Sequence, residues 1–168
     1  LNLMRQIANL TNQLFTYQNP ILDVVFDKYR LSAVHPLVGR NESEAVVTFA
    51  LRVASSDKNL LVNKKTVNDE ITSVFHSLLL KKQSIVIAGQ TSVGKTEVQK
   101  YLLGLLAKDT RVLIIDQGIE LAIVKSLHPH LDVTLWRYDN NSKENNLSSL
   151  IKVALRFNPD YLVIAEAR

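Results

Sequence analysis

Residues 84–96 have the sequence SIVIAGQTSVGKT, and this stretch decides the fold. An apolar run is followed directly by the pattern G-x-x-x-x-G-K-T, which extends from Gly89 to Thr96. Glycines allow a tight turn whose backbone N–H groups point inward at a phosphate, and a following helix presents its positive end to the same anion. The stretch therefore predicts a strand at 84–88, a phosphate-binding loop, and a helix at about 95–107.

Two side chains of this loop carry the chemistry of nucleotide binding. Lys95 is placed to reach the outer phosphates, and the hydroxyl of Thr96 is a candidate Mg²⁺ ligand. We therefore expect ATP and Mg²⁺ as cofactors. The expected binding residues are Gly89, Gln90, Thr91, Ser92, Val93, Gly94, Lys95 and Thr96. The alternative is a glycine-containing loop that binds nothing, and the predicted strand-loop-helix context disfavours it.

After residue 65, apolar runs typical of strands alternate with helical patterns. Strands are expected at 84–88, 111–115, 131–137 and 161–165, and helices at 67–81, 95–107, 118–127 and 146–157. Thr66 is the expected N-cap of the first of these helices. Such alternation is typical of an α/β protein with a parallel sheet covered by helices on both faces.

Residues 1–64 show a different pattern, which predicts a small α+β module. The expected elements are an amphipathic helix at 1–18, closed by Pro20, strands at 21–26, 29–35 and 45–54, and a polar linker at 55–65. We therefore divide the chain into an N-terminal module at 1–64 and the N-terminal part of a P-loop domain at 65–168.

Composition narrows the classes of partner. The net charge is +4, but the basic residues are scattered, which favours an ordinary solvated surface over a nucleic-acid or anionic-lipid site. We therefore expect no specific nucleic acid. The chain has no cysteine, which excludes disulfides and thiolate metal sites. It starts at Leu1 and stops at Arg168, directly after a predicted strand, so we expect it to be part of a larger protein.

Acidic residues at the strand ends are candidate catalytic groups. A phosphate site in a parallel sheet lies beyond the carboxyl ends of the strands. Asp116 and Glu166 each follow such an end, and Glu120 comes one helical turn after Asp116. Carboxylates there suit Mg²⁺ retention and the orientation of an attacking water. The alternatives are solvated strand ends and, for Glu120, an ordinary acid at a helix N-terminus. Asp160 precedes its strand and is expected to be a structural turn residue.

The end of the chain resembles a known family. Residues 155–168, LRFNPDYLVIAEAR, are similar to the L-R-x-x-P-D-x-(apolar)₃-G-E-x-R signature of the type II/type IV secretion ATPases. Residues 112–121, VLIIDQGIEL, resemble the acidic box of that family. The resemblance implies a RecA-like parallel-sheet P-loop domain, truncated here, that forms a homo-hexamer when full length. It also implies that Glu166 is the Walker B glutamate acting on water and that Glu120 matches a family glutamate.

The resemblance further implies an ATPase that powers a membrane-embedded secretion, conjugation or pilus-assembly machine. Its expected place is cytoplasmic, at the inner face of the cell membrane. Segments around Arg30 and Arg52 resemble those through which the family's N-terminal domain reaches the outer phosphates. Surface salt bridges on a strand are the alternative for both arginines. Because any group supplied by later residues is missing, we expect the 168-residue chain itself to have almost no ATPase activity.

Several positions depart from the family pattern and leave a second function open. In the loop, Gln90 is larger than usual, Ser92 replaces glycine and Val93 replaces serine. Downstream of Lys95, Glu97 stands where threonine is common, Asp116 where glutamate is usual, and Ala165 where glycine is usual. The alternative function is a nucleotide-binding scaffold subunit with little or no hydrolysis.

Overall fold

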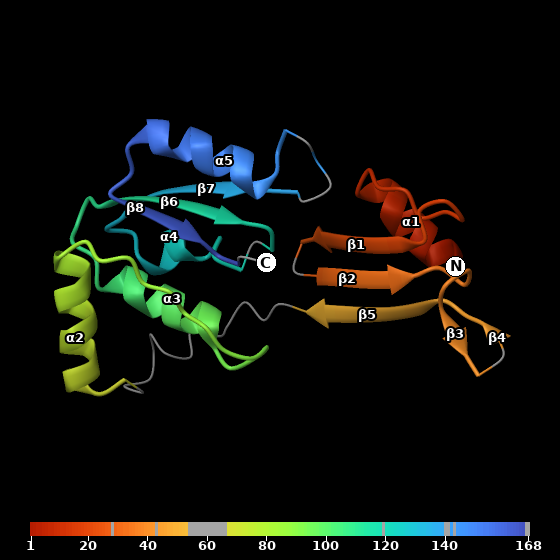
Figure 1. Ribbon diagram of the computed structural model, residues 1–168, viewed down its shortest axis with the longest axis horizontal. Helices are drawn as coiled ribbons and strands as arrows, with labels where there is room; N and C mark the ends of the chain where they lie inside the picture. The colour runs from red at the N-terminus through yellow and green to blue at the C-terminus, as the bar shows by residue number, and fades with distance from the viewer. Residues whose placement is uncertain are drawn as a thin grey trace. The chain divides into compact units, whose positions relative to one another are not determined.

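The structure is a computed structural model of the 168-residue chain. It describes residues 1–27, 29–42, 44–53, 67–118, 120–139, 142 and 144–166. The chain divides into two compact units, Leu1–Lys58 and Asn59–Arg168 (Figure 1). The predicted linker at 55–65 lies outside the described residues, and the predicted division at 64/65 stays a prediction. Within the described ranges, no helix is long and apolar enough to cross a membrane.

The first unit is an antiparallel sheet with one helix packed against it. Its elements are α1 (Asn2–Leu10), β1 (Ile21–Phe26), β2 (Tyr29–Val34), β3 (Arg40–Asn41), β4 (Glu44–Ala45) and β5 (Thr48–Val53). The sheet order is β1-β2-β5, and β3 pairs with β4 separately. Alternate residues of β1 and β2, such as Leu22 and Leu31, are buried against Met4 and Ala8 of α1. The predicted α+β composition of this region is confirmed.

The predicted helix at 1–18 was too long, because α1 ends at Leu10. The hydroxyl of Thr11 donates to the carbonyl of Ile7 at 2.9 Å, and Asn12 then takes a left-handed φ of 55°. A threonine hydroxyl that bonds to the helix backbone and a following left-handed residue both favour termination. Phe15 is nevertheless buried in the core. The apolar periodicity therefore predicted the burial of this segment correctly, but it overestimated the length of the helix.

The second unit is a parallel sheet between helices. Its elements are α2 (Asp69–Leu80), α3 (Lys95–Gly104), β6 (Arg111–Asp116), α4 (Val124–Leu127), β7 (Asp132–Arg137), α5 (Leu147–Ala154), a 3₁₀ turn (Leu155–Phe157) and β8 (Tyr161–Ile164). The strand order is β7-β6-β8, and both pairings are parallel. The predicted strands at 111–115, 131–137 and 161–165 are confirmed, as is the mixed α/β class.

The central strand β6 is buried on both faces. Val112 and Ile114 belong to a core that includes Leu79 of α2 and Leu103 of α3. Leu113 and Ile115 lie on the opposite face of β6. They pack with residues of α5. Figure 1 shows α5 on one side of the sheet and α2, α3 and α4 on the other. The prediction of helices on both faces is therefore correct.

The strand predicted at 84–88 is not formed, since no strand among the described residues pairs with it. Its residues still alternate in burial: Ile85 packs against the core, whereas Val86 is 90% exposed. Strand β6 is already paired on both edges, so this segment could join the sheet only beyond β7 or β8. The apolar run was correctly predicted to be partly buried, but a strand also needs a backbone partner.

Two helix starts also differ from the prediction. α2 begins at Asp69, and its N-cap is Asn68, whose side chain accepts from the N–H of Ile71 at 2.8 Å. The expected cap, Thr66, lies outside the described residues. The helix expected at 118–127 is reduced to the short α4, because a turn fixed by the Asp116 carboxylate occupies its first residues.

Candidate functional site

The loop before α3 ends at a glycine that leaves the start of the helix without a side-chain cap. Gly94 is the N-cap of α3 and takes a left-handed φ of 94°, which a residue without a Cβ adopts readily. Asn68 and Asn146 cap α2 and α5 with their side chains, whereas Gly94 has no side chain to do so. The first N–H groups of a helix have no intrahelical acceptor, so this helix start can accept an anion.

Ser92 keeps a glycine-like conformation although it is not a glycine. Its φ is 65°, in the left-handed region, at one of the positions where the loop departs from the family pattern. For an L-residue that conformation costs roughly 1 kcal/mol. At the start of the loop, a Cβ on Gly89 would meet Cγ2 of Val93 at 3.0 Å. The departures therefore leave the loop turn in place and add local strain.

Lys95 folds back over the loop. Its ammonium donates to the carbonyl of Gly89 at 2.9 Å and to the carbonyl of Gln90 at 2.7 Å. These are bonds from a charged donor to neutral acceptors, and an anionic phosphate is a stronger acceptor. The ammonium therefore lies at the loop, where it can exchange carbonyl partners for phosphate oxygens.

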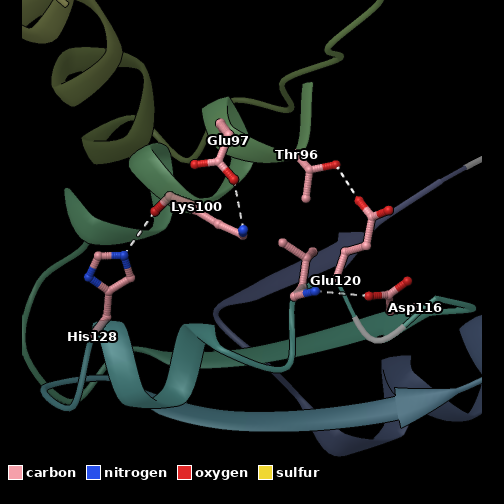
Figure 2. A network of polar contacts seen from close by, with 7 residues as sticks. Thr96, Glu97, Lys100, Asp116, Glu120 and His128 are labelled. Atoms are coloured by element: carbon pink, nitrogen blue, oxygen red, sulfur yellow. Dashed lines mark hydrogen bonds and ion pairs between the residues drawn. The ribbon is translucent and has the colours of Figure 1, made fainter. Parts of the chain in front are cut away.

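Thr96 and Glu120 are brought together by the fold. The Thr96 hydroxyl donates to Oε2 of Glu120 at 2.9 Å (Figure 2). Thr96 lies in the first turn of α3, and Glu120 lies in the turn that follows β6. This contact joins the loop to the acidic segment across 24 positions of sequence.

The carboxylate of Asp116 makes different contacts from that of Glu120. It is 5% exposed, and both of its carboxylate oxygens accept backbone bonds. Oδ1 accepts from the N–H of Gly118 at 2.8 Å, and Oδ2 accepts from the N–H of Leu121 at 3.1 Å. Figure 2 shows the second of these bonds. The Asp116 carboxylate therefore closes the turn that carries Glu120.

Glu166 lies two residues after the end of β8. The N–H of Ala165 donates to the carbonyl of Ile115 at 3.0 Å, so the pairing with β6 continues to this point. Glu166 and Asp116 thus lie at the same carboxyl edge of the sheet, as the sequence predicted for both. The side chain of Gln99 donates to the carbonyl of Ala165 at 3.2 Å and links α3 to this edge. Sequence reasoning missed Gln99, although it lies one helical turn after Lys95.

A buried ion pair explains another departure from the family pattern. Oε1 of Glu97 lies 2.8 Å from the ammonium of Lys100, and both side chains are largely buried.

The ring of His128 contacts the backbone of α3. Its Nε2 lies 2.9 Å from the Lys100 carbonyl, and because a carbonyl can only accept a hydrogen bond, the ring is the donor. Burial lowers the pKa of His128. The ring lies so close to α3 that a Cβ on Gly104 would come within 2.6 Å of its Cε1.

Asp160 is a structural residue at the opposite end of the sheet, as expected. Its Oδ2 accepts from the N–H of Arg111 at 3.0 Å, and its own N–H donates to the Arg111 carbonyl at 2.9 Å. The bond from the Arg111 backbone lowers the pKa of the Asp160 carboxyl, and Lys82 at 3.6 Å acts in the same direction.

The two candidate arginines belong to the first unit. Nη2 of Arg30 lies 3.5 Å from Oδ2 of Asp23. Arg30 therefore makes a surface ion pair, which the sequence analysis gave as the alternative to a phosphate-binding role. Arg52 on β5 lies directly opposite Arg30 on β2 in the antiparallel register of the two strands. Their predicted contact with the outer phosphates stays a prediction.

The described residues do not form a metal cage of their own. Among them, no group of three or more His, Cys, Asp or Glu could hold a metal ion. Mg²⁺ at a nucleotide site needs only one or two protein oxygens, because phosphates and waters complete its shell. The pair of Thr96 and Glu120 fits that requirement.

Fold and site together define a mixed α/β protein with a phosphate-loop motif before α3 and with acidic groups at the carboxyl edge of its parallel sheet. Residues 53–167 match the family described as "Uncharacterised conserved protein UCP018868". The match takes in more than half of the chain, and the chain belongs to this family.

The chain is also similar in sequence to several named proteins. It is 32% identical to the uncharacterized protein pXO2-25 of Bacillus anthracis over 99% of this chain and 36% of that protein. It is 28% identical to the putative conjugal transfer protein Rv3659c of Mycobacterium tuberculosis over 83% of this chain and 39% of that protein. Protein VirB11 of Rhizobium radiobacter is 25% identical over 60% of this chain and 29% of its own length. The chain therefore spans well under half the length of these relatives.

Among solved structures, the VirB11 ATPase from the Brucella suis type IV secretion system, in complex with sulphate, is similar to this chain. The TM-score is 0.49 and the identity 20%, over 96% of this chain and 52% of that one.

Proposed function

We propose that the full-length protein is an ATP-binding and hydrolysing motor subunit of a secretion, conjugation or pilus-assembly machine. The observation that carries the proposal is the bond from Thr96 to Glu120, which joins the phosphate-loop motif to an acidic side chain. The sequence similarity to VirB11 and to a putative conjugal transfer protein supports the choice of machine. A homo-hexamer at the inner face of the cell membrane belongs to the same proposal.

The loop residues fit a magnesium–nucleotide complex. Lys95 would hold the outer phosphates after leaving the carbonyls of Gly89 and Gln90, and the start of α3 would hold the same anion. The Thr96 hydroxyl and the Glu120 carboxylate would hold the metal ion. Bound MgATP would supply the phosphoryl group and the divalent charge that neutralises it.

Glu166 is the residue proposed to orient the attacking water. It lies at the carboxyl edge of the sheet, directly after the residue that Gln99 ties to α3. A carboxylate at this edge can accept a proton from water as the phosphoryl group is transferred. Arg30 and Arg52 are proposed to approach the outer phosphates from the first unit.

The test is ATP binding and phosphate release by the full-length protein, with Mg²⁺ or with EDTA. We expect Mg²⁺-dependent turnover in the wild type and loss of tight ATP binding in Lys95→Ala. Lys108→Ala is the matched control, because Lys108 is an exposed lysine of the same unit. Unchanged affinity in Lys95→Ala would contradict the loop assignment. A wild type that binds MgATP tightly and releases no phosphate would instead support the scaffold function.

A further inference from the structure

We propose that Asp116 is a positioning residue, which acts on the nucleotide site only through Glu120. This inference rests on the proposed function and assigns distinct roles to two acids that sequence reasoning treated alike. Asp116 holds the backbone of the turn after β6, and Glu120 makes the contact with Thr96.

Both oxygens of the Asp116 carboxylate already accept backbone hydrogen bonds. Its two oxygens accept from Gly118 and Leu121, at 2.8 Å and 3.1 Å, and the residue is buried. Bonds from backbone N–H groups to a carboxylate are charge-assisted and about twice as strong as neutral ones. A metal ion or water bound directly by Asp116 would have to share these oxygens with the two amides in a buried place.

The two amides that bind Asp116 lie on either side of Glu120 in the sequence. The bond to Gly118 spans two residues, which is the geometry of an Asx turn, and the bond to Leu121 fixes the residue directly after Glu120. Leu121 is fully buried and packs in the core beside Val124. The path of the backbone at Glu120 is therefore set by Asp116 on one side and by core packing on the other.

Aspartate suits position 116 because of the length of its side chain. An Asx turn needs a carboxylate one methylene from the backbone, so a glutamate cannot form the same ring with the N–H two residues on. The shorter side chain that departs from the family pattern is thus the one that can close this turn. A carboxylate acting directly on water or metal would not depend on the Gly118 bond.

The first experiment uses hydrogen–deuterium exchange of the full-length protein without nucleotide. We expect Asp116→Asn and Asp116→Glu to speed exchange about tenfold or more in peptides containing Gly118 and Leu121, since charge-assisted bonds are lost. Glu120→Gln should leave that exchange unchanged. Asp109→Asn, an exposed carboxylate elsewhere in the unit, is the control. Unchanged exchange in both Asp116 variants would overturn the proposal.

The second experiment measures the gain in ATP affinity that Mg²⁺ gives, as the ratio of dissociation constants with EDTA and with Mg²⁺. We expect Asp116→Asn, Asp116→Glu and Glu120→Gln each to reduce this gain several-fold. Adding Asp116→Asn to Glu120→Gln should reduce it no further, because Asp116 acts through Glu120. Multiplying losses in the double variant, or a normal gain in Asp116→Glu, would show that Asp116 acts directly.

The two failures can be distinguished. A wild type without Mg²⁺-dependent ATP binding or turnover would contradict the proposed function, and the exchange experiment would still decide whether Asp116 holds the turn.

Discussion

Arg30 on β2 and Arg52 on β5 are directly opposed in the antiparallel pairing, so their side chains leave the same face of the sheet. Like charges in such a pair repel each other, and Asp23 offsets one of them through its ion pair with Arg30. Two arginines at directly opposed positions on one face of the sheet form a surface that favours a multiply charged anion.

We therefore expect Arg30→Gln and Arg52→Gln each to weaken ATP binding by the full-length protein by about tenfold, the typical loss for one charged hydrogen bond. Arg52→Gln should not lower the thermal midpoint, because it removes a repulsion, whereas Arg30→Gln removes the ion pair with Asp23 together with that repulsion. Titration calorimetry and thermal denaturation check the two statements. Arg40→Gln, on the exposed strand β3, serves as the control. Wild-type ATP affinity in both variants would show that Arg30 and Arg52 make only surface interactions and do not contact the nucleotide.

Glu166→Gln should retain ATP binding and lose turnover by about 10²–10⁴-fold, because the amide keeps the shape of the side chain but cannot accept a proton. Phosphate release and equilibrium binding are measured on the same preparation. Glu144→Gln, an exposed acid before α5, should behave as the wild type. Turnover at the parental rate in Glu166→Gln would exclude this residue from water activation.

Ser92→Gly should stabilise the protein by about 0.5–1 kcal/mol, because glycine takes the left-handed φ of 65° without steric cost. Thr91→Gly is the control. Thr91 is not among the residues with positive φ, so glycine there should destabilise by roughly the same amount. Denaturant unfolding of both variants gives the comparison. Destabilisation by Ser92→Gly would show that the loop conformation imposes no strain on serine.

The buried His128 makes stability depend on pH. Its pKa is lowered from the ordinary 6.5 by burial, so the unfolded chain takes up a proton at a higher pH than the folded one. The stability contributed by the neutral ring is present above pH 6.5 and is lost as the pH falls toward the lowered pKa. We expect the unfolding free energy to fall as the pH drops below about 6.5, and to fall less in His128→Gln. His76→Gln, at an exposed position, should keep the wild-type dependence.

Local pattern was enough to predict most of the second unit. The alternating strands and helices, the helix after the loop and the acids at the carboxyl edge all follow from apolar periodicity and from the geometry of parallel sheets. The first unit's strands were predicted in the same way, since β-branched residues alternate along them. These features depend on neighbours in sequence, or on a rule common to all parallel sheets.

What pattern could not predict depends on pairing and on side-chain contacts. The run at 84–88 looks like a strand, but strand formation depends on a partner elsewhere in the chain. Asp116 and Glu120 differ in their hydrogen-bond partners. Asp116 accepts from backbone N–H groups, whereas Glu120 accepts from the Thr96 hydroxyl, and this difference arises only in the folded chain. The bond from the His128 ring to the Lys100 carbonyl likewise arises only when α4 packs near α3.

The close approach of the His128 ring to Gly104 has a consequence for evolution. The two positions share one small volume, so a side chain at position 104 is tolerated only where position 128 has become smaller. Among descendants of a common ancestor, changes at these two sites should therefore occur in compensating pairs. A lineage that acquired alanine at position 104 first would pass through a less stable intermediate before the second change restored its fitness.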